Sequence, residues 1–240
     1  MADARLALAL LRDWDGRLDR DSSAATVFEL FVAEIWRRVA EARAPRSAEW
    51  ALGRGFTPLV SITTFAAGRV SRLLERVRTQ PEGWFARPWP GEIADALAAA
   101  VRELRSRYGP EPSGWAWGRV RTLTLEHPLS VIRPLAPVLN RGPFAWGGDG
   151  NTISQAGNTP LRPLGNPLNI ASLRVVVEVG DWDGSRFALP GGQSGNPFST
   201  HYDDLIPYWL RGDGVPIAWS ADAVSRSTVS MLRLRPLAAE

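Results

Sequence analysis

The 240-residue sequence contains no cysteine and only two histidines, His127 and His201. The absence of cysteine excludes disulfides, thiol nucleophiles and cysteine metal sites, and it leaves the compartment undecided. Two histidines are too few for most histidine metal sites. We therefore predict that this chain itself binds no metal ion.

Long hydrophobic runs are also missing. The apolar stretch Leu6–Leu11 is too short to cross a bilayer, and Arg12, Asp13 and Asp15 follow it closely. This pattern is typical of neither a signal peptide nor an anchor, so we expect no membrane partner.

Lysine is absent as well, so all 28 basic residues are arginines, and 25 acidic residues bring the net charge to +3. Arginines and acids are interleaved along the chain, as in Arg72, Glu75 and Arg76. This spacing favours ion pairs on helix faces over a stripe that binds phosphates. We predict no nucleic-acid partner.

The first part of the chain has the apolar period of helices. Residues such as Val27, Phe31, Ile35 and Val39 recur at spacings of four. The pattern predicts helices near residues 3–13, 22–43, 58–78 and 91–108. Asp21 or Ser22 is expected to cap the second helix, and Tyr108-Gly109-Pro110 to end the fourth. Residues 1–112 are therefore predicted to form a helical lobe.

From Trp117 onward the apolar period changes to two, which is typical of strands. The clearest example alternates Leu173, Val175, Val177 and Val179 with Arg174, Val176 and Glu178. Loops rich in Gly, Pro and Asn separate the predicted strands. Residues 113–240 are therefore predicted to be β-rich, and the whole chain to have an α+β fold in which a helical lobe precedes antiparallel strands.

Two polar segments invite an ion-binding interpretation. Gly147–Thr152 lacks the ending of a P-loop and the acidic pattern of an EF-hand, and we interpret it as a turn with positive φ in Asp-Gly-Asn, entering a strand. Asp13–Gly16 and Asp19–Ser22 are interpreted as a helix stop, a turn and a new cap rather than a cation site.

Four segments resemble, in their order along the chain, the penicillin acylase family of N-terminal-nucleophile amidohydrolases. They are LLRDWDGRLDRDSSAATVFELF (10–31), WGRVRTLTLEHPL (117–129), GGDGNTISQAG (147–157) and GQSGNPFSTHYDDLIPYWLRG (192–212). The resemblance implies the C-terminal portion of an αββα fold, from the last part of the family's large chain.

The resemblance also implies what lies elsewhere. Family members expose a serine nucleophile by cutting their own precursor, whereas this chain opens MADARLALALL. We therefore expect the nucleophile and the family calcium site upstream, no catalytic group here, and the fragment to be inactive alone. Its partners would be the remainder of the precursor and an N-acyl substrate, a β-lactam antibiotic or an acyl-homoserine lactone. The full-length parent is expected to be periplasmic or secreted.

Glu178 is the one carboxylate singled out, because it interrupts an apolar strand where burying it alone would be costly. Some cephalosporin-type relatives place a glutamate on a similar strand, where it orients a histidine near the nucleophile. The alternative is an ion pair between Glu178 and Arg174.

The motif Gly192, Gln193, Ser194, Gly195, followed by His201 and Tyr202, is interpreted as structural. His201 is expected to tie the Gly192–Gly195 loop to Tyr202 by hydrogen bonds, or else to border the substrate cleft.

Two rival hypotheses remain. One is a catalytically inert, truncated or structural product. The other is an unrelated serine hydrolase in which Ser194 or Ser199 acts with His201 and Asp203 or Asp204. The strand-to-helix elbow of such hydrolases is missing, which argues against it.

Overall fold

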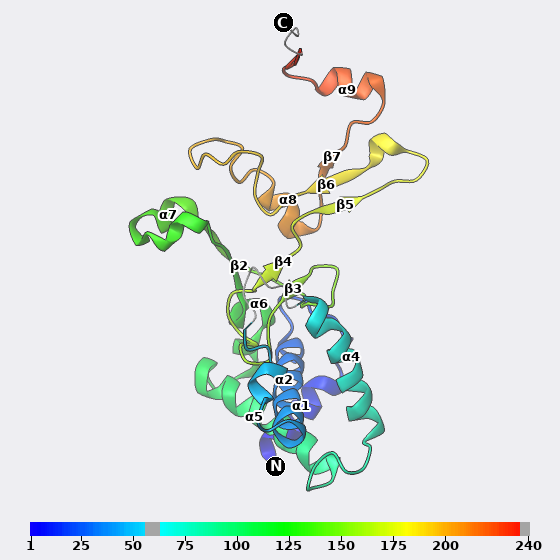
Figure 1. Ribbon diagram of the computed structural model, residues 1–240, viewed down its shortest axis with the longest axis vertical. Helices are drawn as coiled ribbons and strands as arrows, with labels where there is room; N and C mark the ends of the chain where they lie inside the picture. The colour runs from blue at the N-terminus through cyan, green and yellow to red at the C-terminus, as the bar shows by residue number, and fades with distance from the viewer. Residues whose placement is uncertain (56–62, 236–240) are drawn as a thin grey trace, which may run out of the picture. The chain divides into compact units, whose positions relative to one another are not determined.

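The computed structural model describes residues 1–55 and 63–235, with side chains described outside 63–67 (Figure 1). It separates into two compact units, Met1–Ala171 and a C-terminal unit from Ser172 onward. The predicted boundary at residue 112 marks a change from helix-rich to strand-rich sequence. The division at Ala171 is one of packing between compact units, so it does not test that prediction.

Four helices of the N-terminal unit correspond to the predicted ones: α1 (Ala2–Arg12), α2 (Ser23–Arg43), α4 (Thr63–Thr79) and α5 (Trp89–Tyr108). The unit also contains short helices that the sequence did not predict: α3 (Ala48–Ala51), η1 (Pro112–Trp115), α6 (Trp117–Val120), η2 (Pro128–Val131), η3 (Arg133–Leu135) and α7 (Ala136–Leu139). Ser22 caps α2 as predicted, its Oγ accepting the Ala25 N–H at 3.1 Å. Gly109, with φ of 89°, ends α5. The predicted start of a helix at residue 58 lies outside the described residues.

A hydrophobic core lies among α1, α2 and α5. Its most buried members come from all three helices and from η1: Ala7, Val27, Ile35, Val101, Leu104 and Trp115. The indole Nε1 of Trp115 donates to the Gly109 carbonyl at 2.9 Å, and its own carbonyl accepts from Thr26 Oγ1 at 2.6 Å. The indole N–H and the backbone carbonyl of Trp115 therefore both have hydrogen-bond partners, so burial of this side chain leaves neither group unsatisfied.

Short strands complete the N-terminal unit. They are β1 (Thr122–Leu125) paired antiparallel with β2 (Arg141–Ala145), and β3 (Ala156–Gly157) paired antiparallel with β4 (Asn169–Ile170). The segment that connects β1 to β2 contains η2, η3 and α7, and its residues Val131 and Ile132 are exposed.

The strand predicted from Trp117 is wrong over its first four residues, which form the helical turn α6. Tertiary contacts override the alternating pattern here. The backbone N–H groups of Trp117 and Gly118 donate to the carbonyls of Ser22 and Arg20 at 3.1 and 2.7 Å. The buried Trp117 indole donates to the Gly148 carbonyl at 2.9 Å.

The C-terminal unit contains a three-stranded antiparallel sheet in the order β5–β6–β7. Its elements are β5 (Arg174–Val176), η4 (Trp182–Gly184), β6 (Arg186–Ala188), α8 (Ile206–Arg211), β7 (Val215–Pro216) and α9 (Ala221–Ser227). Arg174 joins β5 to α8: its guanidinium donates to the Trp209 carbonyl at 2.5 Å and lies 4.8 Å from the indole centroid. The predicted ion pair between Arg174 and Glu178 is therefore wrong.

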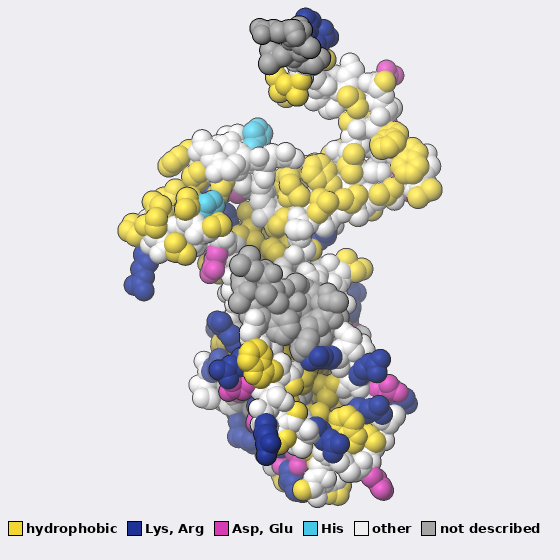
Figure 2. Space-filling view, viewed as in Figure 1, with side chains coloured by type: hydrophobic (Ala, Val, Ile, Leu, Met, Phe, Trp, Pro, Cys, Tyr) yellow, Lys and Arg dark blue, Asp and Glu magenta, His cyan; other side chains and the backbone are white. Residues whose placement is uncertain are grey.

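One face of this sheet is apolar and only partly covered by its own unit. Val175 pairs with Phe187, and Phe187 pairs with Val215, so these three side chains share a face. Val175 in β5 and its neighbours Leu173, Val177 and Val179 are all exposed, Val179 to 82%. Hydrophobic side chains gather over β5 and β6 in Figure 2. Such a face is normally covered by a second layer of structure.

The α+β prediction, with antiparallel strands after the helices, is confirmed. Among the described residues, no helix combines the length and the hydropathy needed to cross a bilayer.

Candidate functional site

The Gly192–Gly195 loop is held by its backbone. The Ser194 N–H donates to the His201 carbonyl at 2.9 Å, and the Leu205 N–H donates to the Gly191 carbonyl at 3.0 Å. A Cβ on Gly192 would collide with the His201 carbonyl, so glycine is required there by close approach of two chain segments. A tight, internally bonded loop is what the sequence predicts.

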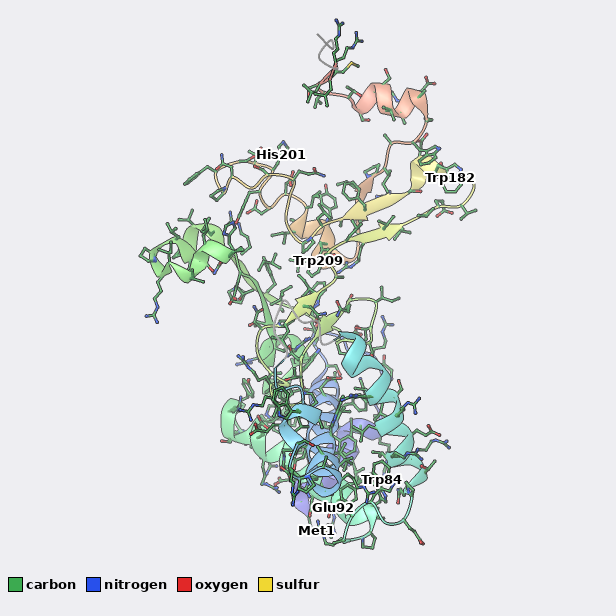
Figure 3. All side chains as sticks on the ribbon, viewed as in Figure 1. Met1, Trp84, Glu92, Trp182, His201 and Trp209 are labelled. Atoms are coloured by element: carbon green, nitrogen blue, oxygen red, sulfur yellow. The ribbon has the colours of Figure 1, made fainter. Side chains whose placement is uncertain are left out.

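The imidazole of His201 contacts Asp204, with Nδ1 and Oδ2 2.7 Å apart. The His201 side chain, labelled in Figure 3, is largely exposed. The histidine and acid of the rival triad therefore do meet. Neither serine completes it: Ser194 Oγ accepts the Asn196 N–H, and Ser199 Oγ accepts the His201 N–H, both at 3.1 Å. A nucleophile–base hydrogen bond is thus not formed by either serine.

Glu178 lies just beyond β5 and is exposed, so it is not the buried carboxylate that its apolar sequence context indicates. Its backbone N–H donates to Ser185 Oγ at 3.1 Å, and among the described residues its carboxylate forms no ion pair. This carboxylate is available to a partner outside the chain.

The sequence interpretation missed a cleft in the N-terminal unit. It has a volume of about 60 Å³ and lies between α2, α4 and the loops around Asp149 and Thr159. Its polar lining includes Glu29, Arg121 and Asp149, and its apolar lining includes Val32 and Trp36. A signal for Glu29 exists in the sequence, because it is spaced four residues from Ala25 and from Ala33 on the inner side of α2.

Glu29 differs sharply from Glu92, a buried carboxylate on α5. Glu92, labelled in Figure 3, binds the guanidinium groups of Arg38 and Arg87 at 2.7 and 2.8 Å. Burial opposes the charge of Glu92, but these two arginines outweigh it and lower its pKa. For Glu29, burial and then the nearby charge of Asp149 raise the pKa to about 8, and Arg121 offsets only part of this. Glu29 is therefore mostly protonated at neutral pH.

Arg121, the third ionisable residue that lines the cleft, is 1% exposed. Its guanidinium donates to the Gly148 carbonyl at 3.0 Å and to the Ala156 carbonyl, and it lies 4.9 Å from the Trp117 ring centroid. Burial lowers the pKa of Arg121 to about 10, so it remains charged at neutral pH.

The Gly147–Thr152 segment is a turn, as predicted, but its details differ. The positive φ falls on Gly148, at 75°, and not on Asp-Gly-Asn, and the next strand begins only at Ala156. Asp149 Oδ1 accepts the Asn151 N–H at 2.8 Å. Across residues 1–55 and 63–235, no group of three or more His, Asp or Glu side chains has the arrangement of a metal site.

Comparison with known proteins places the chain in a family. The model of the family described as "Penicillin amidase" matches residues 1–226. This chain belongs to the penicillin amidase family.

Two relatives illustrate the match. Penicillin acylase 2 proenzyme from Pseudomonas sp. (strain SE83) is 31% identical over 229 residues, covering 93% of this chain and 28% of the relative. Acyl-homoserine lactone acylase QuiP from Pseudomonas putida is 29% identical over 216 residues, covering 87% of this chain and 26% of the relative. The chain thus spans little more than a quarter of the curated relatives it matches.

A solved structure also aligns with the chain, that of a thermostable penicillin G acylase from Alcaligenes faecalis. The TM-score is 0.45 and the identity 17%, with 98% of this chain and 43% of that chain covered.

Proposed function

We propose that this chain is the C-terminal portion of an acylase that hydrolyses linear amide bonds of N-acyl compounds. The observation that carries the proposal is the asymmetry of the matches: relatives align with 93% of this chain but with only 28% of their own length. The two relatives are named for penicillin and for acyl-homoserine lactones, so β-lactam antibiotics and acyl-homoserine lactones are the substrate classes proposed.

The proposed chemistry depends on a serine at the N-terminus of the family's large chain. Its free α-amine acts as base on its own hydroxyl, the hydroxyl attacks the amide carbonyl, and an acyl-enzyme forms and is hydrolysed. Hydrogen-bond donors stabilise the oxyanion. These groups are proposed to lie upstream of Met1, and this chain is proposed to supply scaffold.

The proposed partner is the remainder of the precursor. The partly exposed sheet face formed by Val175, Phe187 and Val215 supports this, because two packed sheets bury such faces against each other. The exposed apolar residues in and beside β5 support this as well, because large exposed apolar patches are normally covered by a partner. The isolated chain is therefore expected to be aggregation-prone.

Glu178 is proposed to orient a catalytic histidine supplied by the upstream segment. Its exposed carboxylate, without an ion pair to the described residues, supports this role. In the reassembled enzyme, Glu178→Gln should lower kcat while leaving thermal unfolding nearly unchanged, because the hydrogen-bonding shape survives and the charge is lost. An unchanged kcat would refute the role.

The proposal is tested by assaying the purified chain on phenylacetyl and long-acyl amide reporters, alone and after coexpression with the polypeptide encoded directly upstream. We expect no turnover by the chain alone and turnover by the reassembled protein. Turnover by the chain alone that is lost in Ser194→Ala or Ser199→Ala would favour the rival serine hydrolase. No turnover in either preparation would favour the inert product.

A further inference from the structure

The turn between β5 and β6 and the segment before α9 bring two exposed tryptophans together. The ring centroids of Trp182 and Trp219 are 5.7 Å apart, and the two residues are exposed to 47% and 68%. Figure 3 labels Trp182 at the end of the β5–β6 hairpin. Tryptophan is largely buried on average and is enriched at the centres of binding interfaces, so an exposed pair indicates a binding surface.

Backbone contacts hold the two rings at this separation. Asp183 Oδ1 accepts the N–H groups of Trp219 and Ser220 at 2.7 and 2.9 Å. The Ile217 N–H donates to the Ser185 carbonyl at 2.8 Å. These hydrogen bonds do not involve the indoles, so the fold fixes the pair while its rings face solvent. A surface that is already ordered loses less entropy when it binds.

The charge around the two rings is negative. Residues 177–185 contain Glu178, Asp181 and Asp183 and no basic residue. The Asp181 carboxylate is exposed and forms no ion pair with the described residues. Arg226 on α9 offsets part of the charge through Asp183. An anion would therefore be repelled, and an apolar group would cover charged carboxylates at a cost in desolvation. The surface favours a cation.

Other tryptophans of this chain show how such a ring binds a cation. Among the described side chains, an arginine guanidinium carbon lies 4.8 to 5.7 Å from the ring centroid of Trp50, Trp84, Trp117 and Trp209. Within the same described set, no guanidinium lies over Trp182 or Trp219. Since the face of an indole attracts cations, this pair has the chemistry of a cation site but no cation from its own chain.

We propose that Trp182 and Trp219 form a docking site for an arginine side chain of a partner polypeptide. The guanidinium stacks on the exposed indole faces, and the Asp181 carboxylate accepts its N–H groups. Arginine suits the site better than lysine, because its planar guanidinium can stack on an aromatic ring and also form paired hydrogen bonds with a carboxylate. The site is independent of the acylase assignment, and all its residues lie in the C-terminal unit.

The test is an NMR titration of the full chain at neutral pH and low ionic strength, followed through the indole N–H resonances of isotope-labelled tryptophan. The probes are blocked tripeptides with arginine, lysine, citrulline, glutamate or leucine between two glycines. Citrulline has the shape of arginine without its charge. We expect the arginine peptide to shift the Trp182 and Trp219 resonances and to bind at least about threefold more tightly than each other peptide.

The opposite results are equally clear. A lysine, citrulline or leucine peptide that binds as tightly as the arginine peptide would overturn the proposal, because the charge and the planar shape of the guanidinium would then contribute nothing. Shifts confined to other tryptophans would overturn it as well. Trp182→Phe and Trp219→Phe assign the two resonances.

Variants locate the binding. Trp182→Ala and Trp219→Ala should each weaken binding of the arginine peptide about twofold to thirtyfold, the range for one cation–π contact. Asp181→Asn should weaken it too. Trp50→Ala is the matched control, because Trp50 is 59% exposed in the other unit and its ring already lies beside Arg54. If an alanine variant unfolds in a thermal melt, the phenylalanine variant replaces it and should bind more weakly than the original chain. Equal binding by all folded variants would refute the site.

Two further measurements test other occupants of the site. If a second copy of the chain supplies the arginine, sedimentation velocity would show association that grows with concentration and is abolished by Trp219→Ala. If a free small cation is the ligand, guanidinium chloride would compete as tightly as the arginine peptide. We expect neither result, and either would overturn the assignment to a partner polypeptide.

Discussion

The two compact units of this chain bury their apolar side chains to very different degrees. In the N-terminal unit, α1, α2 and α5 enclose a continuous core in which Ile35, Val101 and Leu104 are fully buried. In the C-terminal unit, Val176 in β5 and Val179 in the turn that follows are exposed to 61% and 82%. Hydrophobic content alone therefore does not make a self-sufficient unit; the apolar side chains must also face one another.

The secondary structure explains the difference. Each helix of the bundle places its apolar residues on one side, so three helices can bury those sides together. The apolar face of a sheet needs a covering layer, and within its own unit β5 pairs with β6 and contacts Trp209 through Arg174 while Val175 and Val176 stay exposed. The first region can be stable by itself, whereas the second is suited to a larger assembly.

Matched truncations in the two units test this contrast most strongly. Leu104→Ala should lower the free energy of unfolding by about 2 to 5 kcal/mol, because it opens a cavity in a fully buried site. Val176→Ala removes methyl groups from an exposed site and should change it by no more than about 0.5 kcal/mol. Denaturant titration of the full chain measures both. Similar losses would show that the sheet is packed in solution and would break the comparison.

Glu29 provides a pH-dependent test within the well-packed unit. Its pKa is raised from 4.5 to about 8, so the folded state retains a proton that the unfolded state releases. This contribution to stability is complete below about pH 4.5, falls as the pH rises, and is lost once the pH passes about 8. Glu29→Gln, which keeps a neutral side chain, should therefore be more stable than the original chain by a margin that grows between these pH values, to at most about 4 to 5 kcal/mol.

Thermal or denaturant unfolding at pH 4.5, 6 and 8 measures this margin. The control is Glu92→Gln, where a paired carboxylate with a lowered pKa is neutralised. That variant should be less stable than the original chain near neutral pH. A Glu29→Gln margin that does not depend on pH would contradict the raised pKa.

The smallest effect is expected for the exposed contact between His201 and Asp204 in the C-terminal unit. His201→Ala should change stability by less than about 1 kcal/mol, because the pair with Asp204 is exposed and its loop is held by backbone hydrogen bonds. Gly192→Ala should cost more, since its Cβ would collide with the His201 carbonyl. Thermal melts of the two variants show whether side-chain or backbone contacts hold the Gly192–Gly195 loop. A larger loss of stability in His201→Ala than in Gly192→Ala would mean that the His201 side chain holds it.

Much of the architecture was predictable because it depends on local periodicity. The helices α1, α2 and α5, the Ser22 cap and the stop at Gly109 follow from residues a few positions apart. The tight Gly192–Gly195 loop was also predictable from its glycines. The helical turn α6 was not, because buried contacts of Trp117 with distant carbonyls outweigh an alternating pattern.

By itself, the sequence determined the order of helices and strands, the α+β class and the motifs that resemble the penicillin acylase family. Only the tertiary structure decided which partners the polar side chains meet. Arg174 contacts the carbonyl and ring of Trp209 rather than Glu178, His201 contacts Asp204, and Glu29 lies near Arg121 and Asp149. Periodicity is a property of neighbours along the chain, whereas burial and charge pairing depend on residues up to 120 positions apart, such as Glu29 and Asp149. The chemistry of a site follows from those long-range contacts.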